Sequence, residues 1–188
     1  MFDRVTMKEM AKGHIRGNIG VLFGCALVIG LISAATSAMW GLGAFLVPAF
    51  MLSNALIYLR LTAGIKPQVG DVFAGFGLFG KALWLNIITA FFVVLWTLLL
   101  YIPGIIKMLA YSMAPYVLAD NPHMTAREAL RESIRLTDGA KMDLFVMQLS
   151  FLGWALLGMV TFGLAYIYVI PYMQATTANA YQALKAAK

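Results

Sequence analysis

Two long stretches of the chain contain no charged residue, and this feature constrains the fold more than any other. Residues 17–59 and 144–184 each run for more than 40 positions without Asp, Glu, Lys or Arg. A membrane-spanning helix needs about 20 apolar residues, so each stretch has room for two spans. Over the whole chain 62% of residues are hydrophobic and 12% are charged, against roughly 25% charged in soluble domains. The sequence therefore predicts an all-α integral membrane protein and excludes an ordinary soluble domain.

The apolar stretches divide into about six transmembrane helices. We place them at residues 19–39, 41–63, 82–101, 104–119, 144–160 and 162–183. Of the 14 Lys and Arg residues, all except Lys107 precede the first span, fall at 60–81 or 127–141, or lie in the tail. The positive-inside rule places those four segments, and both termini, in the cytoplasm. We expect three hairpins that enter the membrane from the cytoplasmic side.

Amphipathic helices are predicted before the first and the fifth span, because basic residues recur there every fourth position. The residues of these basic stripes are Arg4, Lys8, Lys12, Arg16, Arg127, Arg131 and Arg135. Thr125 and Glu128 form a capping box at the start of the second helix, and Gly139 can end it. At the cytoplasmic surface the stripes would attract anionic lipid headgroups, at about 1 kcal/mol per basic residue.

The two stripes indicate an internal repeat within a single membrane domain. A shift of 119 residues superposes Lys8, Lys12 and Arg16 on Arg127, Arg131 and Arg135. With a looser copy between them, the pseudo-repeats span about 1–64, 65–120 and 121–188. Convergence is the alternative, because any interfacial helix alternates basic and apolar residues.

No constellation of catalytic or metal-binding residues can be assembled from the sequence. The chain has two His and one Cys without metal-ligand spacing, and neither His14 nor His123 lies in an apolar span. The glycines of residues 75–80 match G-x-G-x-x-G, but the βαβ context of a nucleotide site is missing, so an interfacial turn is expected. We therefore expect no enzyme activity, no cofactor and no bound metal. No basic cluster alternates with exposed aromatic residues, so we expect no nucleic-acid partner either.

Polar residues on one broad face of the fourth span are candidates for a polar path through the membrane. They are Lys107, Tyr111, Ser112, Tyr116 and Asp120. A Lys held near mid-bilayer costs roughly 2.5 to 3.5 kcal/mol, which makes it a functional candidate. Alternatively, Lys107 lies close enough to the start of its span to reach the outer interface.

Other polar and small residues in the spans are expected to support helix packing. Gly20 and Gly24 form a GxxxG unit, and Asn54, Asn86 and Asn179 can form hydrogen bonds between helices. Close approach at the glycines is compatible with packing inside the chain and equally with a homo-oligomer or another membrane-protein partner. Pro48, Pro115 and Pro171 should kink or break the second, fourth and sixth spans.

The segment YIPGIIKMLAYSMAPYVLADNP at 101–122 and the segment ESIRLTDGAKMDLF at 132–145 resemble the bacterial multi-pass membrane family catalogued as domain of unknown function 975. The resemblance covers nearly the whole chain and implies a bacterial cytoplasmic membrane protein, without an established reaction or catalytic residues. Asp138 departs from it, because similar proteins often have a basic or small residue there, and this makes strong anionic-lipid binding at that connection less secure. The element at 132–141 also resembles the membrane domain attached to some glycerophosphodiester phosphodiesterases.

Two functions follow as hypotheses from these patterns. The first is a non-enzymatic protein that binds or organises lipids, with anionic membrane lipids as partners of the basic stripes, or another hydrophobic ligand. The second is a transporter or an export or immunity component, with the polar face of the fourth span lining its path. The two differ in geometry, because a transport path requires Lys107 to point into a cavity at membrane depth.

Overall fold

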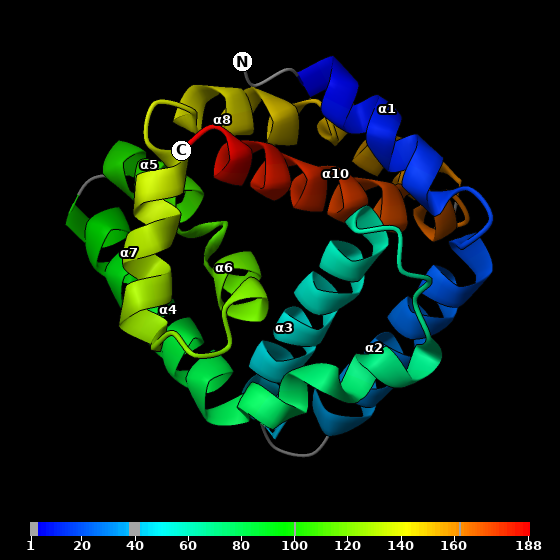
Figure 1. The fold of residues 1–188 in the computed structure, drawn as a ribbon, viewed down its shortest axis with the longest axis horizontal. Helices are drawn as coiled ribbons and strands as arrows, with labels where there is room; N and C mark the ends of the chain where they lie inside the picture. The colour runs from blue at the N-terminus through cyan, green and yellow to red at the C-terminus, as the bar shows by residue number, and fades with distance from the viewer. Residues whose placement is uncertain (1–3, 38–41, 100, 162) are drawn as a thin grey trace.

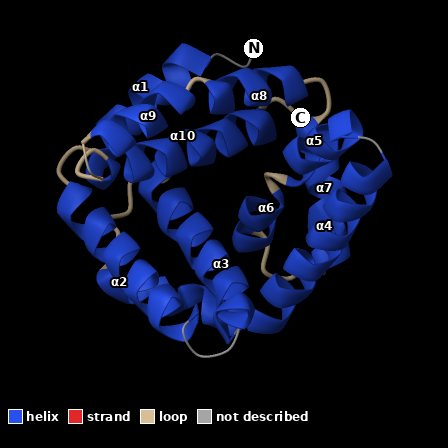
Figure 2. Ribbon diagram, turned by 180° about the vertical axis from the view of Figure 1, so that it is seen from behind, coloured by secondary structure: helices blue, strands red, loops and turns tan. Residues whose placement is uncertain are grey.

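A computed structural model describes residues 4–37, 42–99, 101–161 and 163–188. Every regular element among these residues is a helix, and no strand occurs in them (Figure 2). This confirms the all-α prediction. In the view down the shortest axis, α3 (Leu42–Thr62) and α6 (Ala114–Asp120) lie inside an outline drawn by α1 (Arg4–Ile15), α2 (Ile19–Ser37), α4 (Phe79–Leu99), α7 (Ala126–Thr137) and α8 (Lys141–Leu149) (Figure 1).

Three segments are long and apolar enough to cross a membrane, and a fourth joins them if a bent helix pair is one span. The three are Phe45–Thr62, Val69–Leu98 and Lys141–Val160. The pair is Val5–Ile15 with Ile19–Ala35, bent by 92°. Gly17 lies at this bend with a φ of 82°, a left-handed conformation that glycine adopts without steric cost. The coarse prediction of a multi-span membrane protein holds, while the number six and the three hairpins stay predictions.

The predicted fourth span differs most from its expectation, because it is not one continuous helix. Helix α5 (Tyr101–Tyr111) ends before two turn residues, and α6 begins at Ala114. Pro115 is the second residue of α6, where its missing N–H and fixed φ are tolerated at a helix start but not in a helix interior. The chain therefore breaks near the middle of this apolar segment. By contrast, Pro48 and Pro171 lie inside continuous helices.

The amphipathic helix predicted before the fifth span is present as α7. Thr125 is its N-cap, and the Thr125 and Glu128 side chains form the capping box. Gly139, two residues after α7, has a φ of 78°, as expected of a glycine that ends a helix. The buried face of α7 contains Ala129, Leu130 and Leu136, so this amphipathic helix packs on the bundle through its apolar face.

The remaining elements close the bundle around α3. A 3₁₀-helix, η1 (Val69–Leu78), leads directly into α4 and packs against α3, where an interfacial turn was expected. After α8 the chain forms α9 (Leu152–Val160) and α10 (Tyr166–Ala186). Helix α10 packs against α1, α2 and α3, and Asn179 on α10 donates a hydrogen bond to the Met7 carbonyl of α1 at 3.2 Å. These contacts bury one side of α10, including Ala175, Thr176 and Tyr181.

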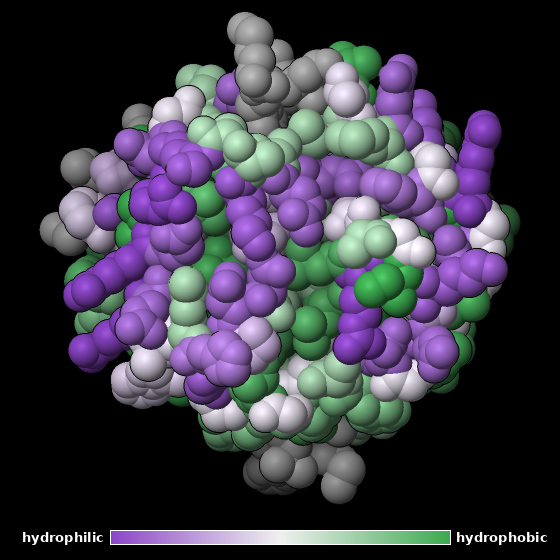
Figure 3. Space-filling model, in the orientation of Figure 1, coloured by the Kyte–Doolittle hydropathy of each residue, from purple (hydrophilic) through white to green (hydrophobic). Residues whose placement is uncertain are grey.

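Hydrophilic side chains gather on one face of the molecule. In the orientation of Figure 1 they cover much of the surface over α7 and α10 (Figure 3). Large apolar side chains are exposed elsewhere, including Phe91 at 63%, Leu98 at 80% and Val160 at 76%. Exposed apolar surface of this extent needs a nonaqueous cover, and a bilayer supplies one.

Candidate functional site

The break between α5 and α6 anchors α7 to the rest of the bundle. Ser133 of α7 is fully buried, and its hydroxyl donates to the Ala110 carbonyl of α5 at 2.7 Å. The buried Thr137 hydroxyl lies 3.4 Å from the same oxygen. Broken helices are tolerated at membrane depth where neighbouring Ser and Thr side chains bond the backbone at the break. The contact therefore holds the apolar side of α7 against α5.

A groove lies between α4 and α7 at this position. It encloses about 550 Å³ and is lined from α4 by apolar and aromatic side chains that include Trp84, Ile88 and Phe91. Arg127 and Arg131 line it from α7. A smaller hollow of about 440 Å³ shares Trp84 and Arg127 and extends to Lys81. The groove thus combines an apolar wall on α4 with two guanidinium groups on α7.

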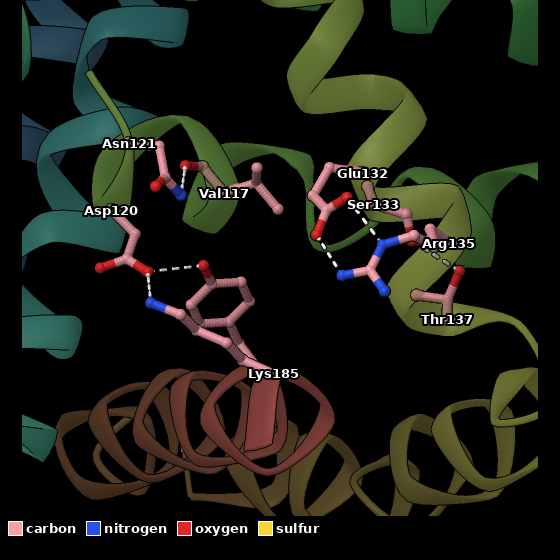
Figure 4. A network of polar contacts seen from close by, with 9 residues as sticks. Val117, Asp120, Asn121, Glu132, Ser133, Arg135, Thr137 and Lys185 are labelled. Carbon is pink, nitrogen blue, oxygen red and sulfur yellow. Dashed lines mark hydrogen bonds and ion pairs between the residues drawn. The ribbon is translucent and has the colours of Figure 1, made fainter. Parts of the chain in front are cut away.

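The cations around this groove differ in how they are engaged. Lys81 donates to the carbonyls of Pro122 and His123, at 2.6 and 3.4 Å, and so fixes the loop before α7. Arg135, one turn beyond the groove, is bound to Glu132 at 2.6 Å (Figure 4). Arg127 and Arg131 are exposed, and in the part of the chain that the structure describes neither forms an ion pair within 4.0 Å. These two guanidinium groups are available to an anion.

The carboxylates of α7 are already engaged by groups of their own helix. The backbone N–H and hydroxyl of Thr125 donate to Glu128 at 2.7 and 2.8 Å, and these bonds lower the pKa of its carboxyl group. The hydrogen bond from Arg135 likewise lowers the pKa of Glu132 and raises that of the guanidinium. Both carboxylates are therefore charged at neutral pH, and Arg131 also lies within the field of Glu128.

The basic stripe of α1 lies apart from the groove. Lys8 donates to the Ser150 hydroxyl at 2.5 Å, and its ammonium lies 5.1 Å from the centre of the Phe151 ring. Lys12 and Arg16 are exposed, and the Arg4 side chain lies outside the described side chains. The buried residues of α1 pack against α10, so the two basic stripes do not form one surface patch.

The five residues of the predicted polar path do not share one environment, although Tyr111 and Ser112 both line a hollow next to α3 and α4. The Lys107 ammonium lies 5.2 Å from the centre of the Trp96 ring on α4. Tyr111 lines the α4–α7 groove, whereas the Ser112 hydroxyl donates to the Leu109 carbonyl of its own helix at 2.7 Å.

The last two residues of the predicted path face α10. Tyr116 donates to the Gln174 side chain at 3.2 Å, and Asp120 pairs with Lys185 at 2.5 Å and accepts a bond from Tyr181 (Figure 4). A continuous path through all five residues, as a transporter requires, stays a prediction.

The residues predicted to support helix packing differ in how closely they contact other helices. Gly20 is exposed, and a Cβ there would meet nothing within 4 Å, while one on Gly24 would make an ordinary contact with Val69 at 3.9 Å. Asn54 is half-buried, Asn86 lies 3.9 Å from the Met51 sulfur, and Asn179 is buried between α10 and α1.

One close backbone contact, between a glycine of η1 and a serine of α3, was not predicted from the sequence. A Cβ on Gly75 of η1 would lie 2.6 Å from both the backbone nitrogen and the hydroxyl of Ser53. The fully buried Ser53 hydroxyl accepts from the Gly75 N–H at 2.9 Å and donates to the Ala49 carbonyl at 3.0 Å. The glycine-rich motif was visible, but the serine that it meets lies 22 residues away and carries no local signal.

The family model described as "Protein of unknown function (DUF975)" matches residues 98–188. No curated protein and no solved structure matches the chain, and none of these comparisons supports the resemblance to the phosphodiesterase membrane domain. The matched residues run from the end of α4 through α10 and include α7 with its two arginines. The C-terminal part of the chain, residues 98–188, thus matches the DUF975 family.

Proposed function

We propose that this protein is a non-enzymatic, multi-pass protein of the bacterial cytoplasmic membrane that binds anionic lipid. The α4–α7 groove would hold part of an acyl chain, and Arg127 and Arg131 would bind the phosphate of the headgroup. The observation that carries the proposal is the combination, in one groove, of an apolar wall on α4 with two guanidinium groups without ion-pair partners on α7.

The chemistry of both parts fits a phospholipid. Arg presents a planar fork of donors that matches phosphate oxygens, and charge-assisted bonds of this kind are about twice as strong as neutral ones. Arg127 and Arg131 are four residues apart and so lie on one face of the helix, where both can reach a single headgroup. Trp84, at the junction of the two hollows, has the amphipathic ring that favours the headgroup level.

The proposal includes a topology. Six spans in three hairpins, with both termini in the cytoplasm, would place α7 at the cytoplasmic leaflet, whose anionic lipids attract basic residues. The hydrophilic surface over α7 and α10 supports this orientation, because a membrane protein presents such a surface to water (Figure 3).

Lipid retention in nanodiscs tests the proposed function. The full chain is reconstituted in equal parts of phosphatidylglycerol and phosphatidylcholine and repurified, and the retained lipids are quantified by mass spectrometry. We expect enrichment of phosphatidylglycerol, and we expect R127Q/R131Q to lower it about 5- to 30-fold. The control K12Q/R16Q removes the same charge from exposed positions on α1 and should retain the enrichment. Equal losses in both variants would reduce the effect to net charge and contradict a specific site.

A further inference from the structure

A further hollow, open on one side, lies between α3, α4 and the break that separates α5 from α6. It holds about 220 Å³. Engineered apolar cavities of roughly 150 Å³ already bind molecules such as benzene, so this hollow can accept a segment of a larger molecule. Pro48 and Pro115 line it, as do Asn86 and Thr89 of α4. Two of its walls belong to the candidate membrane spans Phe45–Thr62 and Val69–Leu98.

The two polar residues that α4 contributes to this hollow have no strong hydrogen-bond partner among the described residues. The amide of Asn86 has one contact, at 3.9 Å from the Met51 sulfur, which is a weak acceptor. The Thr89 hydroxyl makes no hydrogen bond among the described residues. A hydroxyl in a helix normally bonds the carbonyl four residues back, as Thr97 of the same helix does with Val93 at 2.7 Å. Polar groups within a membrane are costly when unpaired, so an external partner would stabilise them.

The lining sets the charge of that partner. Among the described residues no Asp, Glu, Lys, Arg or His borders the hollow, and its other polar members are the hydroxyl side chains of Tyr111 and Ser112. A charged ligand group would be buried there without a counter-ion, which is strongly unfavourable. Amide and hydroxyl groups together can both donate to and accept from an uncharged oxygen.

We propose that this hollow is a binding site for a neutral amphiphile, a hydrocarbon chain that carries one uncharged hydroxyl or carbonyl group. Asn86 and Thr89 bond the polar group, and Leu52, Leu85 and Met108 contact the chain. The site differs from the α4–α7 groove in the ligand charge that it accepts. Tyr111 is the one residue that lines both hollows, so their ligands would meet the same ring from two sides.

Retention of radiolabelled oleyl alcohol and (Z)-9-octadecene by the purified full chain tests this site. The two probes have the same chain length and differ in the hydroxyl group. We expect the protein to retain about 2- to 10-fold more of the alcohol, the range of one hydrogen bond. N86L and the nearly isosteric T89V should each lower this preference towards unity. T97V removes a hydroxyl from the same helix outside the hollow and should leave the preference unchanged.

Three results would overturn the proposal: equal retention of both probes by the natural chain, a preserved preference in T89V, or an equal loss in T97V. Thermal unfolding of each variant checks folding, and T89V decides if N86L does not fold. R127Q/R131Q should keep the preference for the alcohol even where anionic-lipid binding is lost. Failure of the two sites can thus be told apart.

Discussion

At the scale of single residues, Gly75 of η1 lies in close contact with Ala49 and Ser53 of α3. The glycine has no side chain, so its backbone can reach the Ala49 carbonyl and the Ser53 hydroxyl of α3. This contact holds η1 against α3 and sets where α4 begins, because α4 follows η1 without a gap. The position of α4, and with it one wall of both hollows, depends on this one small residue.

Gly75→Ala should therefore destabilise the protein by about 1–3 kcal/mol, the cost of overpacking a tight contact. The added Cβ would lie 2.6 Å from the Ser53 nitrogen, so the backbone must move. Gly77→Ala is the matched control, because a Cβ on Gly77, in the same 3₁₀-helix, would meet nothing within 4 Å. Thermal unfolding in detergent measures both. Equal unfolding midpoints for the two variants would refute the packing role.

Glu128 gives the stability of α7 a dependence on pH. Its hydrogen bonds from Thr125 lower the pKa of the carboxyl group below its ordinary value of 4.5. The stabilising contribution is therefore complete above about pH 4.5 and is lost as the pH falls through the folded-state pKa. In Glu128→Gln the unfolding midpoint should fall less steeply between neutral pH and pH 3 than in the natural chain. An unchanged slope would show that the capping box does not couple to protonation.

At the scale of elements, local sequence patterns predicted where helices end better than they predicted which helices pack together. Thr125, Glu128 and Gly139 mark the two ends of α7 by residue type and spacing, and all three lie where predicted. Pro115 was expected to kink or locally unwind a span, and it lies next to a full break between α5 and α6. A proline shows where a helix is weakened, but packing of the neighbouring helices decides whether it bends or separates.

Contacts between distant elements could not be predicted, because one sequence gives no partner for a buried hydroxyl or amide. Ser133 bonds a carbonyl 23 residues away, and Asn179 bonds one 172 residues away. Asn179 was expected to link helices, but its partner helix α1 was not identified. The face shared by Lys107 and Asp120 follows from the spacing of one straight helix, so the break after Tyr111 separates residues that the spacing had joined.

Ser133→Ala should weaken the attachment of α7 to the break by about 1–3 kcal/mol. The Ala110 carbonyl would lose its 2.7 Å donor and keep only the longer contact with Thr137. Ser112→Ala is the control, because that hydroxyl bonds a carbonyl of its own helix. The readouts are thermal unfolding and phosphatidylglycerol retention, and both should decline in Ser133→Ala. Retention that survives full loss of this contact would mean that α7 is held by its apolar face alone.

At the scale of the whole molecule, the distribution of polarity separates the two proposed binding sites. Hydrophilic side chains cover much of the surface over α7 and α10 (Figure 3), and large apolar side chains are exposed on α2, α3, α4 and α9. Arg127 and Arg131 of α7 line the α4–α7 groove, whereas only uncharged residues of α3, α4 and the broken segment line the other hollow among the described residues. Ligand charge would therefore decide which site is occupied.

The most direct measurement of the central claim is quenching of Trp84 by lipids with brominated acyl chains. Trp84 is half exposed and lines the α4–α7 groove, and replacing Trp40, Trp96 and Trp154 by Phe leaves it as the sole tryptophan. In nanodiscs of equal phosphatidylglycerol and phosphatidylcholine, brominated phosphatidylglycerol should quench Trp84 more than brominated phosphatidylcholine does. R127Q/R131Q should abolish the difference. Equal quenching by both lipids with the two arginines intact would contradict an anionic-lipid site in this groove.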